Sequence, residues 1–194
     1  MNFAKFLFVA TLGLVSSGVV CAAAGDPFFQ DEETIYLPTQ RVKELMYQGK
    51  EQQALELAEK SLENNPKSAQ LRFIRGVLLN DLGRKQEAKE VFEQMIREFP
   101  EISEPYNNLA VMYAAEGNLG MAKDLLEKAL ANNAKSALTY SNLGNVYLAM
   151  ARDSFRQAAK TNPNNKMIQS KIQGIDKLLN GVEINTSQKP QKTK

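Results

Sequence analysis

Side chains able to carry out catalysis are scarce in this chain, which contains no histidine, the commonest general base and metal ligand near neutral pH. Its single cysteine, Cys21, can form neither an internal disulfide nor a thiolate metal cluster. The densest carboxylates are Glu87, Glu90 and Glu93. They lie beside Lys89 and fit a solvated helix face with local ion pairs. Because no nucleophile motif, phosphate loop or ligand cluster is present, we expect no enzyme activity, no cofactor and no metal.

The composition narrows the function class further. Hydrophobic residues make up 43% of the 194 residues and charged residues 24%, as in an ordinary folded domain or repeat array. The 24 basic and 22 acidic residues give a net charge of +2, so the chain lacks the electrostatic footprint of a nucleic-acid-binding protein. Composition therefore argues against catalysis and against nucleic-acid binding.

A period of 34 residues organises the chain. Gly49, Gly83 and Gly117 are 34 residues apart, and an alanine follows each of them after five residues. These alanines are Ala54, Ala88 and Ala122. Apolar residues at helical spacing lie on both sides of each glycine, and Ser68 and Ser136 stand where they would cap the following helix. Each unit therefore predicts two helices joined at the glycine, which cannot bury their apolar faces alone and must stack on neighbouring units.

This pattern resembles the tetratricopeptide repeat (TPR) family, whose signature runs aromatic-x₂-Leu-Gly-x₂-Tyr, then Ala-x₃-Phe, then Pro. The residues that carry the match are Tyr140, Leu143, Gly144 and Tyr147 in one unit, Tyr106, Leu109 and Tyr113 in another, and Gly76, Ala88, Phe92 and Pro100 in a third. The resemblance implies an all-α fold, a right-handed superhelical stack of helix-turn-helix repeats known as an α-solenoid. It covers residues 35–163, divided into units 35–68, 69–102, 103–136 and 137–163.

The last unit, 137–163, departs from the period. The turn glycine expected at position 151 is replaced by Ala151, and the Ala-x₃-Phe pair arrives early, as Ala151 and Phe155. No glycine follows Gly144 and no proline interrupts the stretch 138–160, which keeps one helical face. We therefore predict a single continuous helix in place of the hairpin.

The resemblance also implies where a partner binds. In the TPR family the first helix of each repeat lines the concave side of the superhelix, where peptides or helices of partner proteins lie. Carried over position by position, the lining consists of Phe73, Val77, Asn80, Asn107, Asn108, Val111, Ser141, Asn142 and Asn145. The expected partner is a protein or a peptide.

Asn108 and Asn142 occupy equivalent positions in this lining, and two interpretations of them stay open. An asparagine amide offers a donor and an acceptor, so a ladder of asparagines would hold a peptide backbone of any sequence. Alternatively, these amides cap the local backbone. A clamp of lysine and arginine on the terminal carboxylate of a peptide is disfavoured, because Glu104 and Asn108 stand where the clamp needs those two basic residues.

Three further segments follow or precede the repeats. Residues 164–181 predict an amphipathic helix whose apolar stripe comprises Ile168, Ile172, Ile175 and Leu179. This helix either caps the array with a polar outer face or offers the stripe to a partner. Residues 182–194 contain three lysines and almost nothing apolar, which predicts a disordered basic tail. Residues 25–34 form an irregular lead-in.

The segment 1–24 has the pattern of a secretory signal peptide. Lys5 precedes an apolar run over 6–20, which is shorter than the ~20 residues of a membrane-spanning helix. Ala22 and Ala24 suit a signal-peptidase site, so we predict cleavage after Ala24 and a periplasmic or secreted protein. The alternative is a lipoprotein acylated at Cys21, an anchored assembly factor for pili or the outer membrane, although a bulky valine precedes that cysteine. Contact with a membrane is expected only in that case.

Overall fold

The computed structural model describes residues 38–180, which are helical with no strand among them. The signal segment, the lead-in and the basic tail predicted from the sequence lie outside the described residues. A helix over residues 38–47 is followed by α2 (Glu51–Asn64), α3 (Ala69–Asp81), α4 (Lys85–Glu98), α5 (Ser103–Ala115), α6 (Leu119–Asn132), α7 (Ala137–Thr161) and α8 (Lys166–Asn180). Within the described residues no helix combines the length and apolarity needed to cross a membrane.

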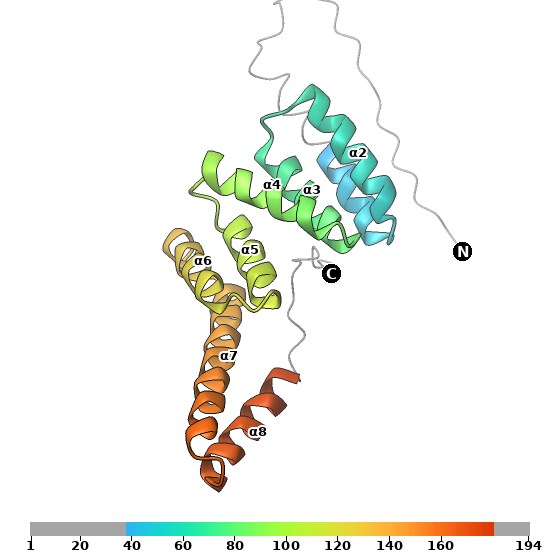
Figure 1. Ribbon diagram of the computed structural model, residues 1–194. Helices are drawn as coiled ribbons and strands as arrows, with labels where there is room; N and C mark the ends of the chain where they lie inside the picture. The colour runs from blue at the N-terminus through green and yellow to red at the C-terminus, as the bar shows by residue number, and fades with distance from the viewer. Residues whose placement is uncertain (1–37, 181–194) are drawn as a thin grey trace, which may run out of the picture.

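The helices form a stack in which each packs against the next along the chain (Figure 1). α3 pairs with α4 and α5 pairs with α6 as antiparallel hairpins, and α5 also touches α7. One continuous core of aliphatic and aromatic side chains runs from the first helix to α7. The predicted all-α fold, an α-solenoid, is confirmed.

The hairpins turn where the sequence period places glycine. Gly49, Gly83 and Gly117 have φ angles of 69°, 79° and 80°, the left-handed conformation that glycine adopts without a Cβ clash. At the corresponding fourth position stands Ala151, and here the chain does not turn. α7 continues through it as one helix of 25 residues, as the missing turn predicts.

Serine caps begin two of the helices that open a unit. The Ser68 hydroxyl accepts a hydrogen bond from the backbone N–H of Leu71 at 3.3 Å, and the Ser136 hydroxyl accepts one from Thr139 at 3.2 Å. Each satisfies a backbone donor that the first turn of a helix leaves without a partner. Both caps agree with the sequence prediction.

Close approach between the two helices of a hairpin depends on a small residue. A Cβ atom added at Gly76 of α3 would lie 2.6 Å from Cε1 of Phe92 in α4, and Phe92 is almost fully buried. The matching residue of the third unit, Ala110, is also buried. In the fourth unit the matching residue is Gly144, around which a Cβ would meet no described atom within 4 Å. In the second and third units the second helix covers this position, but the fourth unit forms no second helix that folds back over Gly144.

Lys89 of α4 contacts the following hairpin, which α5 and α6 form. Its ammonium group donates to Glu116 at 2.9 Å and lies 3.9 Å from the ring centroid of Tyr113 in α5. The hydrogen bond with Glu116 raises the pKa of Lys89, because it favours the charged form of the lysine. The Tyr113 hydroxyl also donates to Glu93 of α4 at 3.1 Å. A polar edge therefore joins α4 to α5 beside the apolar core.

Gly76→Ala and Gly144→Ala test the hairpin packing with one substitution at matching positions. Gly76→Ala is expected to destabilise the fold by about 1–3 kcal/mol, because the methyl group collides with Phe92 in a closely packed core. Gly144→Ala is expected to stabilise it by about 0.5–1 kcal/mol, because alanine favours the helix and meets no neighbour among the described residues. Urea unfolding at one protein concentration measures both, and equal effects would contradict the uncovered position of Gly144.

Candidate functional site

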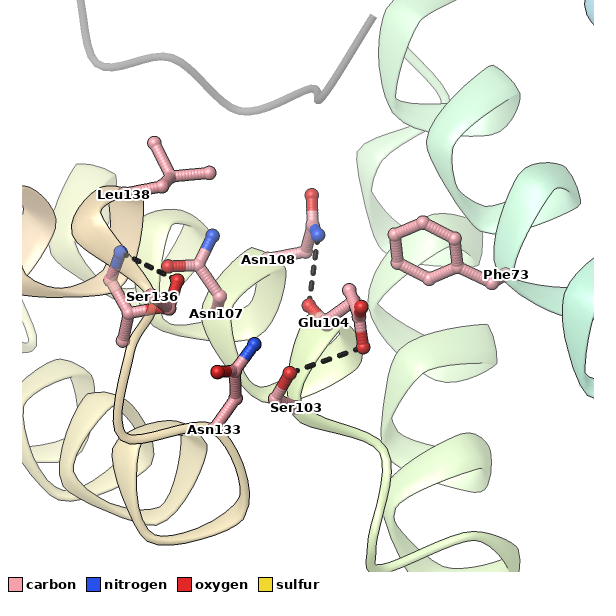
Figure 2. A pocket seen from close by; sticks show the side chains of 9 residues that line it. Phe73, Ser103, Glu104, Asn107, Asn108, Asn133, Ser136 and Leu138 are labelled. Atoms are coloured by element: carbon pink, nitrogen blue, oxygen red, sulfur yellow. Dashed lines mark hydrogen bonds between the residues drawn. The ribbon is translucent and has the colours of Figure 1, made fainter. Parts of the chain in front are cut away.

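A hollow opens where the first turns of α5 and α7 face α3 (Figure 2). It is lined by Phe73, Ser103, Glu104, Asn107, Asn108, Asn133, Ser136, Leu138 and Thr139. Phe73 comes from α3, the residues from Ser103 to Asn108 come from α5, and the last residues surround the start of α7. Three consecutive units therefore contribute to one site.

Asn108 occupies the middle of this hollow. Figure 2 shows its side chain between Phe73 on one side and Leu138 on the other. Its Nδ2 atom donates to the backbone carbonyl of Glu104 at 2.9 Å. This bond fixes the amide plane and leaves the Oδ1 atom, which accepts none of the described hydrogen bonds, as an acceptor for a ligand.

Among the described residues that line the hollow, Glu104 alone is charged. Its side chain is exposed, and its Oε2 atom accepts a hydrogen bond from the Ser103 hydroxyl at 3.2 Å. The hollow thus combines one negative charge and several amides and hydroxyls with the apolar edges of Phe73 and Leu138. Such a lining suits a polar backbone with occasional apolar or basic side chains.

Asn107 and Asn142 join α5 to α7. The Nδ2 atom of Asn142 donates to the Oδ1 atom of Asn107 at 3.0 Å, and each residue is only 5% exposed. A hydrogen bond between two buried side chains fixes how α7 lies on α5, because leaving either amide without its partner costs free energy. Asn142 therefore has a structural role that its sequence position did not reveal.

The residues predicted from the sequence divide between two hollows. Phe73, Asn107 and Asn108 line the hollow described above. Val111, Asn142 and Asn145 line a second one between α5, α6, α7 and the end of α8. The other three predicted residues, Val77, Asn80 and Ser141, line neither hollow, and Val77 is part of the core.

The second hollow has a different character. Ala110, Val146 and Leu179 make its wall largely apolar, and Arg152 reaches into it from α7. The guanidinium group of Arg152 lies 3.7 Å from the carboxylate of Asp176 in α8. This ion pair links α8 to α7, so the residues of the second hollow serve mainly to pack these helices together.

Six residues that line the first hollow were not predicted from the sequence. These are Ser103, Glu104, Asn133, Ser136, Leu138 and Thr139, which belong to first helical turns or to the loop before α7. The available signal was their position: each lies at the start of a unit's first helix, or just before it. Among the described residues, no group of three acidic, cysteine or histidine side chains could hold a metal ion.

The Tetratricopeptide repeat family model matches residues 39–101 and 81–137, which together span just over half of the chain. The chain belongs to the tetratricopeptide repeat family. TPR proteins are generally non-enzymatic scaffolds that bind other proteins, so the fold indicates a protein–protein interaction scaffold. Comparison with curated proteins gives no match.

Solved TPR structures resemble this one in fold. A thermophilic TPR protein from Thermus thermophilus gives a TM-score of 0.56 with 22% identity, over 74% of this chain and 82% of that one. PilF of Pseudomonas aeruginosa gives 0.55 with 19% identity, over 75% of this chain and 69% of that one. The MamA protein gives 0.54 with 20% identity, over 76% and 85%. At such identities the likeness shows the fold alone.

Asn142→Ala and Asn108→Ala separate the asparagine that bonds across two helices from the one that bonds its own helix. Asn142→Ala is expected to destabilise the fold by about 1–3 kcal/mol, because it leaves the buried Oδ1 atom of Asn107 without its donor. Asn108→Ala is expected to cost less than about 1 kcal/mol, because the Glu104 carbonyl keeps its helical partner and alanine favours the helix.

Denaturant unfolding measures both variants. Adding Asn107→Ala and the Asn107→Ala/Asn142→Ala double variant completes a double-mutant cycle on Asn107 and Asn142. The expected coupling between Asn107 and Asn142 is about 0.5–3 kcal/mol. Additive effects of the two single substitutions would show that the bond does not fix α7 on α5.

Proposed function

We propose that this TPR protein holds an extended segment of another protein in the hollow between α3, α5 and α7. The observation that carries the proposal is the placement of Asn108, whose amide is fixed by Glu104 and stands between two apolar side chains. A peptide backbone presents N–H and C=O groups in alternation, and the Oδ1 atom of Asn108 receives an N–H. Phe73 and Leu138 receive the flanking side chains.

The charge of the hollow selects among segments. Glu104 attracts a lysine or arginine of the segment and repels a terminal carboxylate, since no described basic side chain lines the hollow to offset its charge. The bound segment is therefore internal to the partner, or lies near its N-terminus, and carries neutral or basic residues. This preference distinguishes the hollow from a carboxylate clamp.

The proposed site of action is the bacterial cell envelope. The support is the sequence of residues 1–24, with one early positive charge, an apolar run and small residues before Gly25. Cleavage there removes the only cysteine, which suits an oxidising compartment. The second candidate, an anchored assembly factor for pili or the outer membrane, is favoured by Cys21 alone.

Site-specific crosslinking in cells tests the groove. A photoreactive amino acid replaces Leu138 at the edge of the hollow, and in a control chain it replaces Gln53, an exposed residue of α2 outside the hollow. We expect Leu138 to trap a partner that Gln53 does not. Mass spectrometry then gives the segment that was bound, and equal labelling from both positions would contradict the proposal.

A synthetic peptide of the trapped segment measures the contribution of Asn108. Asn108→Ala is expected to weaken binding about five- to tenfold, the effect of one lost hydrogen bond. Gln53→Ala removes an exposed amide elsewhere and is expected to leave the affinity unchanged. Fluorescence anisotropy of the labelled peptide checks both variants, and unchanged binding by Asn108→Ala would reject the role given to this amide.

The mass of the mature N-terminus tests the proposed location. In a Gram-negative host that expresses the full sequence, we expect intact-mass spectrometry to find a chain that begins with a free Gly25. A chain that begins with acylated Cys21 would establish the anchored alternative instead. A chain that retains Met1 would contradict export in either form.

A further inference from the structure

The fourth unit leaves one face of α7 uncovered by the described residues. In the third unit α6 folds back on α5, and Tyr106 is 8% exposed. Tyr140 occupies the same position 34 residues later and is 55% exposed, while Tyr147 is 47% exposed. Since α7 runs straight on where a hairpin would turn back, no second helix within residues 38–180 covers these tyrosines (Figure 1).

A regular stripe of small and aromatic residues runs along this side of α7, and we call it the open face of α7. It comprises Tyr140, Gly144, Tyr147, Ala151, Ser154 and Ala158. Ala151 and Ala158 are half-buried, and the other four residues are exposed. Their spacings alternate between four and three residues, the seam of a helix that packs lengthwise on another helix. α8 packs along the adjoining flank of α7, through Asp176 against Arg152 and Arg156 and through Lys171 on Phe155. The open face stays exposed at Tyr140, Gly144, Tyr147 and Ser154.

The chemistry of the open face is that of an interface. None of its six residues is charged, whereas the solvated side of a surface helix is normally rich in charge. The Ser154 hydroxyl donates to the Met150 carbonyl at 3.0 Å, and the Tyr147 hydroxyl donates to Glu127 at 3.3 Å. These two hydroxyls are satisfied within the chain, so burying this face leaves neither of them without a partner.

The chain itself carries the element that this face lacks. In the second unit Phe92 covers Gly76, and Phe92 belongs to an Ala-x₃-Phe pair that begins at Ala88. In the fourth unit the corresponding pair is Ala151 and Phe155. Because α7 is continuous, this pair lies further along the same helix as Gly144 and does not fold back to cover it. The hairpin therefore cannot close within the fourth unit, and the position over Gly144 stays open to a helix from another copy.

We propose that the open face of α7 is a self-association surface, on which a second copy of this chain lays its own α7 in antiparallel orientation. With position 149 at the two-fold axis, Tyr147 opposes Ala151 of the other copy, and Tyr140 opposes Ala158. Gly144 then opposes Ser154. Each large ring meets a small residue, so the stripe is complementary to itself, as a two-fold interface requires. The peptide hollow lies elsewhere and stays open in the dimer.

Sedimentation of the protein expressed from its full sequence tests the dimer. The unaltered protein is expected to dimerise at micromolar concentration. Ala151→Glu and Ser154→Glu place a charge in the seam and are expected to raise the dimer dissociation constant by about 30-fold or more. Gln157→Glu adds the same charge to an exposed residue of α7 beside the seam and is expected to leave the dimer intact. Circular dichroism confirms that each variant folds.

A second variant restores the hairpin. A copy of residues 117–121 inserted between Met150 and Ala151 supplies the turn glycine and returns Ala151 and Phe155 to the register of the third unit. The second helix then covers Tyr140 and Gly144, and the variant is expected to be monomeric while it keeps its peptide hollow. The proposal is overturned if the unaltered protein is monomeric, if both seam charges leave a dimer unchanged, or if the insertion variant still dimerises.

Discussion

A helical hairpin closes only where one residue can take the left-handed backbone conformation, and this constraint decides what each unit of the array becomes. Glycine meets it at three turns, with φ between 69° and 80°. Alanine at position 151 would be strained there by about 1–2 kcal/mol, whereas in a helix it is the most favourable residue. The three units with a turn glycine therefore form hairpins, whereas the fourth unit, with alanine at that position, forms one long helix.

The two sides of α7 respond differently to the lost turn. Its array side, with Thr139, Asn142, Leu143 and Val146 buried, packs on the third unit as the first helix of any TPR would. Contacts on this side come from the preceding hairpin and need no second helix behind them. The opposite side depends on the missing helix alone. Loss of one turn thus leaves the hollow between α3, α5 and α7 intact and exposes Tyr140 and Tyr147.

The sequence predicted the fold well because its signals are local. Glycine spacing, helical periodicity and serine caps each act within a few residues, and the continuous α7 followed from the absence of a turn residue. The candidate site was harder, because it depends on contacts between units. The 34-residue register equates Asn108 with Asn142, yet Asn142 bonds Asn107 across two helices while Asn108 bonds its own helix. Only the packing of α7 on α5 separates these roles.

The last described helix packs loosely on the array. α8 has no fully buried residue, and its predicted stripe of Ile168, Ile172, Ile175 and Leu179 is only half-buried against α7. Met167 and Leu178 remain exposed, as do Tyr140 and Tyr147 of the open face. Repeat arrays gain stability from each interface between neighbours, and an end without a covering neighbour is the weakest part. An antiparallel α7 from another copy would supply that neighbour over the exposed tyrosines of the open face.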